Sequence, residues 1–283
     1  MTIGEAFAHC ERVAREHYEN FPVASLMLPR GKRRYVASLY AFARAADDFA
    51  DEGTLPDDER LRLLDDWERK LDACYDGRPE GPVFIALAET VRTFDIPREV
   101  PGALLTAFRM DVTRHRYRDF DGLLEYCRNS ANPVGRLVLA LFGVAHPLAY
   151  PPSDAICTGL QLANFWQDLS VDLRKGRVYL PLEDCGRFGY TEGDLMRGVT
   201  DHRFRALMQY QVDRTRTFFQ AGLPLLDLVG PRLRMELAAT IGGGRAILKA
   251  IERSGFDVLN RRPALRLTDR VLVLGRAFRH IVR

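Results

Sequence analysis

The chain has 283 residues, of which 47% are hydrophobic and 28% are charged, and its formal net charge is +3 at pH 7. This composition is that of a folded protein rather than a disordered one. The small net charge, and the lack of a motif that combines aromatic and basic residues, argue against nucleic acid as a partner.

Membrane and redox signals are also weak. No apolar run reaches the ~18 residues that a membrane-spanning helix needs, and no signal sequence is expected. The five cysteines are scattered and form no CxxC pair. This spacing argues against a zinc site and a disulfide framework, and favours a reducing cytoplasm.

Helical patterns fill the chain, and short turns with glycine or proline separate them. The expected helices, in chain order, cover residues 3–19, 29–52, 57–74, 80–95, 97–113, 120–142 with a break at Asn132–Pro133, 153–174, 202–228, 231–253 and 268–281. Residues 147–152 are expected to be a loop, and residues 182–200 a polar, glycine-rich connection. Neither strand alternation nor an internal repeat is found, so the sequence predicts one all-α domain spanning residues 1–283.

The second expected helix carries a polar stripe. Tyr40, Arg44, Asp47 and Asp51 are three or four residues apart, so they share one helix face. Alanine and phenylalanine flank them rather than lysine. Taken alone, the stripe is either an acidic helix end in solvent or one side of a metal site.

A second stripe lies in the helix expected over residues 153–174. Gln161, Asn164, Asp168 and Asp172 follow one another at +3, +4 and +4 and present amide and carboxylate oxygens on one face. Mg²⁺ is typically held by one or two carboxylates together with substrate phosphate. Basic residues follow the stripe. Taken alone, the stripe is either a solvated helix face or one side of a binding site. Two such stripes in an all-helical chain favour cations that clamp a diphosphate.

Three other stretches leave alternatives open. Asp111 is a candidate third carboxylate, while the arginines at residues 114–118 are expected in a surface turn. The helix broken near Pro133 either lets a ligand or another chain approach the backbone or is a packing kink. The C-terminal helix over residues 268–281 either packs against the other helices or rests, through its basic face, on an anionic membrane.

The motifs DDFAD at residues 47–51 and QxxNxxQDxxxD at residues 161–172, followed by GRVYLP, resemble those of the squalene and phytoene synthase family. The resemblance covers about residues 10–262. It implies an all-α isoprenoid-synthase helical bundle with a central cavity, where Mg²⁺, or Mn²⁺ in its place, bridges aspartates to a diphosphate. Prenyl tails would lie in an apolar tunnel.

By position, the resemblance assigns roles to residues of both motifs. The implied metal ligands and catalytic carboxylates are Asp47, Asp51, Asp168 and Asp172. The implied substrate-binding residues are Tyr40, Arg44, Asp111, Gln161, Asn164, Phe165, Gln167 and Arg177. Tyr126 resembles a catalytic tyrosine of the cavity. The aromatic residues proposed to stabilise a carbocation are Phe42, Tyr126, Phe165 and Trp166.

Four segments are most similar to bacterial hydroxysqualene synthases of the hopanoid route, namely residues 17–25, 40–53, 130–136 and 163–181. Gln167 stands where condensing members of the family carry an arginine, and a cavity tyrosine of relatives is missing near Gly244. The smaller wall there could leave room for an ordered water, which the Gln167 and Asn164 amides could hold. The implied reaction ionises presqualene diphosphate, and water captures the cation to give hydroxysqualene. NADPH is not expected.

Two alternatives belong to other classes. One is a transferase that condenses two farnesyl diphosphates head-to-head to presqualene diphosphate or squalene. The other is a non-catalytic, membrane-associated assembly or binding homologue. The expected location is the cytoplasm, with peripheral contact at the inner face of the cytoplasmic membrane and association with neighbouring squalene-pathway enzymes.

Overall fold

The structure is a computed structural model that describes residues 1–16, 30–51 and 53–264. The expected helix over residues 268–281 and the similar segment over residues 17–25 therefore lie outside the described residues. Within them, every regular element is helical, and the sole strand-like pairing is an isolated bridge between Arg116 and Val178. The all-α prediction is confirmed.

The chain divides into two compact units. Unit 1 consists of Met1–Thr113 and Arg136–Ala145, and unit 2 of Arg114–Gly135 and His146–Arg283. One of the three points at which the chain passes between units, after Gly135, falls inside a helix, α8 (Asn132–Phe142). Organisation as one domain over residues 1–283, with a central cavity, stays a prediction.

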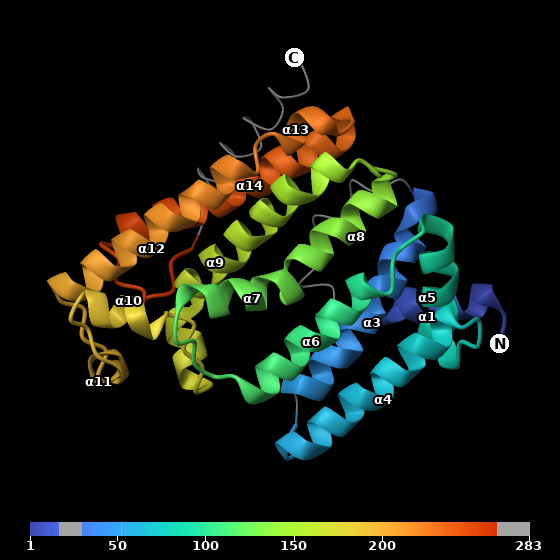
Figure 1. The fold of residues 1–283 in the computed structure, drawn as a ribbon, viewed down its shortest axis with the longest axis horizontal. Coiled ribbons are helices and arrows are strands. Elements are labelled where there is room, and N and C mark those ends of the chain that lie inside the picture. Colours follow the sequence, from blue (N-terminus) through green and yellow to red (C-terminus); the bar gives the residue numbers. More distant parts are fainter. Residues whose placement is uncertain (17–29, 52, 265–283) are drawn as a thin grey trace. The chain divides into compact units, whose positions relative to one another are not determined.

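The elements of unit 1, whose α-helices are labelled in Figure 1, are α1 (Ile3–Glu16), η2 (Arg30–Lys32), α3 (Arg33–Asp51), α4 (Asp57–Tyr75), α5 (Gly81–Phe94), α6 (Glu99–Thr113) and the greater part of α8. Helix α3 packs against α1, α4, α5 and α6. Aromatic side chains fill the core of unit 1, where Phe42 stacks on Trp67 and meets Phe84 edge to face. Burial of such rings is the main stabilising term here.

Unit 2 contains the first turn of α8 and the remaining elements, which are α7 (Phe120–Ser130), η3 (Pro147–Ala149), α9 (Tyr150–Arg174), α10 (Leu182–Arg187), α11 (Glu192–Met196), α12 (His202–Ala221), α13 (Leu225–Leu228) and α14 (Pro231–Arg253). Helix α9 is central, because α7, α12 and α14 all pack against it. Side-chain hydrogen bonds add to these contacts. For example, the indole of Trp166 on α9 donates to Thr215 Oγ1 on α12 at 2.8 Å.

The break expected near Pro133 is present, because α7 ends at Ser130 and α8 begins at Asn132. Its surroundings favour the packing explanation. A Cβ atom at Gly135 would lie 2.6 Å from both Ser153 Oγ and Cys157 Sγ, so the first turn of α8 packs closely against α9. The Thr158 hydroxyl also donates to Asn132 Oδ1 at 3.0 Å.

Several boundaries differ from the expected ones. The loop expected over residues 147–152 is instead η3 followed by the first turn of α9, which holds Pro151 and Pro152. Proline is tolerated in a first turn because the N–H groups there have no partner within the helix. The connection over residues 182–200 contains α10 and α11, and the helix expected over residues 202–228 ends at Ala221.

Candidate active site

The first polar stripe lies on α3 in unit 1. The Arg44 guanidinium is 2.6 Å from Asp48 and 3.7 Å from Asp47, both on the same helix. The Arg44 side chain is 17% exposed and that of Asp47 is 48% exposed. Asp48, which the sequence did not single out, is thus the closer partner of the arginine. This pairing holds a positive charge beside Asp47, one of the two predicted metal ligands on α3.

A second arginine fixes the end of this stripe. Arg60, on α4, donates to the carbonyl oxygens of Phe49 and Ala50, at 3.3 and 2.6 Å, and to that of Gly53 at 2.9 Å. The last carbonyls of a helix have no partner within it, and a cation there also favours the helix dipole. Arg60 therefore holds the final turn of α3, which carries Asp51.

Two further predicted residues lie in unit 1. Tyr40 is half-buried on α3, and burial raises the pKa of its hydroxyl, with Arg44 lowering it and Asp48 and Asp47 raising it. The phenol therefore stays protonated near pH 7. Asp111 is partly buried on α6, which packs against α3.

The second stripe lies on α9 in unit 2. Gln161, Asp168 and Asp172 are partly buried, and Asn164 is exposed. The residues on the other faces are buried among neighbouring helices; they include Leu162, Phe165, Trp166 and Leu169. The stripe is therefore the accessible face of α9, as its spacing predicted.

A distant segment of the chain meets α9 at Gln167 and at the stripe residue Asp168. The guanidinium of Arg262 forms a two-point ion pair with Asp168, in which Nη2 lies 3.1 Å from Oδ2 and Nε contacts Oδ1. Next to it, Gln167 Nε2 donates to the Pro263 carbonyl at 2.6 Å. Neither Arg262 nor Pro263 belonged to a motif, because their partners lie more than 90 residues away.

The end of the second stripe is also held by an arginine. The backbone N–H of Arg177 donates to the Asp172 carbonyl at 2.9 Å, and Arg116 donates to the carbonyl of Gly176 and pairs with Glu192. The prediction that the arginines over residues 114–118 form a surface turn is therefore wrong for Arg116. Its segment runs beside residues 176–183 through backbone hydrogen bonds.

An aromatic cluster adjoins this stripe within unit 2. Phe165 stacks on Tyr179 at 3.8 Å between ring centroids, and Tyr126 lies 5.8 Å from Phe165 and 5.9 Å from Tyr179. Tyr117 also stacks on Tyr179, at 5.6 Å. Tyr126 and Phe165 were predicted as site residues. Tyr117 and Tyr179 were missed, although Tyr179 lies within the GRVYLP segment.

Two other predicted aromatic residues belong to the packing cores. Phe42 and Trp166 have no exposed surface, so neither ring can line a space that a substrate enters. Phe42 is enclosed by Trp67 and Phe84, and Trp166 is hydrogen-bonded to α12. Their proposed role in stabilising a cation is therefore wrong.

At Gly244 itself, the room expected for a water is filled. A Cβ atom at Gly244 would lie 2.9 Å from Phe219 Cε1 and 3.1 Å from Leu160 Cδ2. The glycine lets α14 approach α9 and α12 closely, and neighbouring side chains occupy the space. At Gly243 a Cβ atom would meet nothing within 4 Å.

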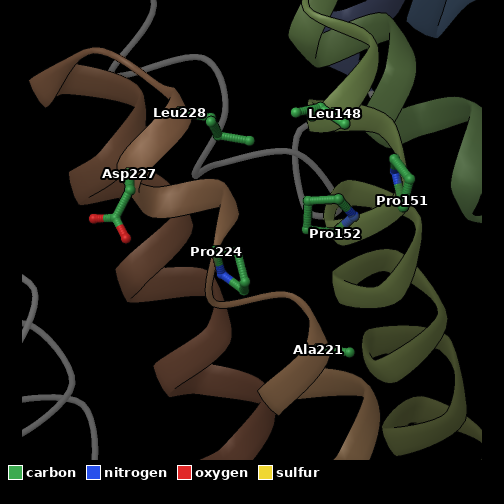
Figure 2. A pocket seen from close by; sticks show the side chains of 7 residues that line it. All are labelled: Leu148, Pro151, Pro152, Ala221, Pro224, Asp227 and Leu228. Atoms are coloured by element: carbon green, nitrogen blue, oxygen red, sulfur yellow. The ribbon is translucent and has the colours of Figure 1, made fainter.

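An apolar groove of about 510 Å³ lies elsewhere in unit 2 (Figure 2). It is lined by Leu148, Pro151, Pro152, Ala221, Pro224, Asp227 and Leu228. Along α9, Asp168 is 16 residues beyond Pro152, or roughly 24 Å at 1.5 Å per residue. The groove is therefore separate from the end of the polar stripe that carries Asp168 and Asp172.

The donor chemistry of both stripes fits Mg²⁺. They present carboxylate and amide oxygens, and Asp168 already attracts a cationic group, the Arg262 guanidinium. Among the described residues, no three His, Cys, Asp or Glu side chains form a group that could hold a metal ion. Mg²⁺ often takes only one or two carboxylates and completes its shell with phosphate and water, so this arrangement suits a metal that arrives with a diphosphate.

The remaining sequence expectations concern thiols and membranes. Each of the five cysteines, all at described positions, is free, and burial raises the pKa of the Cys127 thiol to about 12. In the part of the chain that the structure describes, none of the helices has the length and apolar character needed to cross a bilayer.

Sequence comparison finds known relatives of the chain. It is 33% identical to the phytoene synthase of Arthrospira platensis over 274 residues, which cover 92% of this chain and 88% of the relative. It is 31% identical to the 15-cis-phytoene synthase of Synechocystis sp. over 285 residues, covering 96% and 84% of the two chains.

A solved structure shows the same relationship. The squalene synthase HpnC from Alicyclobacillus acidocaldarius matches with a TM-score of 0.86 and 40% identity, over 90% of this chain and 95% of that one. This match agrees with the all-α isoprenoid-synthase fold that the sequence predicts. Residues 14–269 match the squalene/phytoene synthase family, and the chain belongs to that family.

Proposed function

We propose that this protein converts presqualene diphosphate and water to hydroxysqualene and diphosphate in a Mg²⁺-dependent reaction. The family and its relatives support an isoprenoid synthase that acts on a prenyl diphosphate. The similarity to the squalene synthase HpnC supports a C30 rather than a C40 product.

The observation that carries the finer proposal is Gln167. This residue is 9% exposed and stands directly before Asp168. The family resemblance implies an arginine at this position in condensing members. Its amide donates to the Pro263 carbonyl, so a neutral side chain fills the position. An enzyme that condenses two substrates handles two diphosphates, whereas one that takes presqualene diphosphate handles one. A neutral side chain at position 167 fits an active site that binds one diphosphate rather than two.

The carboxylates act by holding the metal. Asp47, Asp51, Asp168 and Asp172 would bind Mg²⁺, which supplies Lewis-acid stabilisation of the departing diphosphate. Arg44 lies beside Asp47 and Asp48 and would position the diphosphate through its guanidinium. Because negative charge develops on the leaving group, these positive charges stabilise the transition state more than the ground state.

The aromatic cluster would protect the resulting carbocation. Tyr126, Phe165 and Tyr179 pack together and keep 7%, 3% and 6% of their surface exposed. The face of an aromatic ring attracts a cation without bonding to it. Water would then add to the cation and lose a proton, which completes the alcohol. Gln167 is a poorer candidate for holding this water than the sequence alone indicated, because its amide nitrogen is already bonded to Pro263.

A second candidate is condensation of two prenyl diphosphates. It is favoured by the sequence relatives, which are phytoene synthases. The two functions differ in the substrate consumed and in the fate of the cation, so one set of incubations separates them.

The test supplies presqualene diphosphate and Mg²⁺ in oxygen-18 water. We expect a triterpene alcohol that carries the heavy oxygen, and no change in rate or product when NADPH is added. Parallel incubations contain farnesyl diphosphate or a C20 prenyl diphosphate alone. Rapid use of either would establish a condensing enzyme, and a hydrocarbon formed only with NADPH would establish a reducing one.

A cytoplasmic location with membrane contact, and association with neighbouring squalene-pathway enzymes, are also proposals. They are motivated by a lipophilic substrate and product. Flotation of the full chain with anionic and neutral liposomes tests membrane contact, and equal, negligible binding to both would contradict it. Co-purification with the enzyme that consumes the alcohol tests the association, and separate elution of the two would contradict it.

A further inference from the structure

The segment after α14 returns to the second stripe, and both lie in unit 2. Helix α14 ends at Arg253, and the chain turns at Gly255 and Phe256, whose φ angles are +66° and +62°. Val258 beyond the turn is fully buried, and Pro263 is buried. We name residues 254–264 the strap.

Two different contacts tie the strap to α9. Gln167 holds the Pro263 carbonyl through a neutral hydrogen bond of 2.6 Å, whereas Arg262 holds Asp168 through charge. The Arg262 side chain is 55% exposed and that of Asp168 is 17% exposed. The arginine can therefore move into solvent without disturbing a core, while Val258 and Gln167 retain the rest of the strap.

The ion pair conflicts with metal binding at the same carboxylate. Both Asp168 oxygens face the Arg262 guanidinium, in the two-point geometry that arginine prefers with carboxylates. A divalent cation on either oxygen would lie within a few ångströms of that positive charge. The two cations repel, and partial burial limits the screening of this repulsion by water.

We propose that Arg262 competes with Mg²⁺ for Asp168, so that binding of metal and diphosphate releases the arginine and loosens the end of the strap. This inference rests on the proposed function, because it takes Asp168 as a metal ligand. Arg262 thereby sets the metal concentration at which the site fills. It also couples filling of the site to a movement of residues 260–264.

The first test measures Mn²⁺ binding to the full chain by electron paramagnetic resonance, with inorganic diphosphate present. Arg262→Gln should bind Mn²⁺ roughly three- to tenfold more tightly than the wild type, the range expected for removing a partly exposed ion pair. Arg261→Gln is the matched control, because Arg261 is an exposed neighbour and should change the affinity little.

Hydrogen exchange supplies a readout that does not depend on turnover. In the wild type, Mg²⁺ with diphosphate should speed amide exchange over residues 260–264 but not at Val258. In Arg262→Gln this exchange should be fast without metal. Exchange over residues 260–264 that metal and diphosphate leave unchanged in the wild type would overturn the coupled movement.

The binding results separate this inference from the proposed function. Unchanged or weaker Mn²⁺ binding in Arg262→Gln, while Asp168→Asn abolishes binding, would overturn the competition alone. If the wild type binds no Mn²⁺, or Asp168→Asn binds it normally, both the competition and the assignment of Asp168 as a ligand fail.

Discussion

The two polar stripes obtain their positive partners in different ways. On α3, Arg44 pairs with Asp48 one turn away on the same helix. On α9, Asp168 pairs with Arg262, which lies 94 residues further along the chain. The first pairing follows from helix geometry, whereas the second depends on how the chain returns after α14. A local pair stays with its stripe, but a distant partner can leave it.

The helix ends repeat this contrast. Arg60 holds the last carbonyls of α3 from about ten residues away, and Arg116 holds the Gly176 carbonyl after α9 from 60 residues away. Each stripe ends near a helix C-terminus that an arginine from another segment of the chain contacts. The two stripes therefore share a design at their ends and differ in the partner of their carboxylates.

The largest expected effect is the loss of a proposed metal-binding carboxylate from either stripe. Asp47→Asn and Asp168→Asn should each lower diphosphate release from presqualene diphosphate by roughly 100-fold or more, because each removes charge that holds Mg²⁺. EDTA should abolish release by the wild type. Asp66→Asn and Asp213→Asn, in exposed ion pairs on α4 and α12, are the controls. Normal release by either stripe variant would remove that stripe from the site.

Glu236 is a contrasting carboxylate, because burial raises its pKa to about 7 while Arg232 lowers it. Its Oε2 atom has no hydrogen-bond partner among the described residues. The folded pKa lies above the unfolded one, so the stability that this group contributes should be lost between about pH 4.5 and 7 as pH rises. Glu236→Gln should be more stable than the wild type at pH 8, by up to about 3 kcal/mol, and similar near pH 4.5. Parallel unfolding midpoints across this range would contradict the assignment.

The close packing of α14 can be tested at two adjacent glycines. Gly244→Ala should destabilise unit 2 by about 1–3 kcal/mol, because the new methyl group meets Phe219 and Leu160. Gly243→Ala should be neutral or stabilising by up to about 1 kcal/mol, since its Cβ meets open space and alanine favours a helix. Thermal unfolding compares them, and equal midpoints would show that the packing is looser than described.

The smallest expected effect on catalysis is at the helix ends. Arg60→Gln and Arg116→Gln should each lower diphosphate release by about tenfold, as is typical for residues that orient a metal ligand. Arg62→Gln is the control for Arg60, because it pairs with Asp58 on the exposed face of α4. A larger loss for Arg116 than for Arg60 would indicate that the α9 stripe depends more on distant contacts, and no loss for either would show that the helix ends do not position the ligands.

The sequence predicted those features that depend on local spacing. Helix periodicity located α3 and α9 and the accessible face that carries Asp168, because residues three or four apart share a face. It could not locate Arg262, which reaches Asp168 only because the chain folds back after α14. It also could not locate Tyr179, whose segment is positioned by backbone hydrogen bonds to residues 114–118. It also misjudged Trp166 and Gly244, because a side chain's spacing does not reveal which neighbouring helix covers it.

The central proposal is that the two stripes bind one shared metal–diphosphate cluster, and it can be tested directly. Mn²⁺ binding in the presence of inorganic diphosphate would be measured for the wild type, Asp47→Asn, Asp168→Asn and the double variant. If the stripes act together, each single variant should lose most diphosphate-dependent binding, and the double variant should be little worse than either. Single variants that each lose a separate share of the bound Mn²⁺, with losses that add in the double variant, would contradict the account.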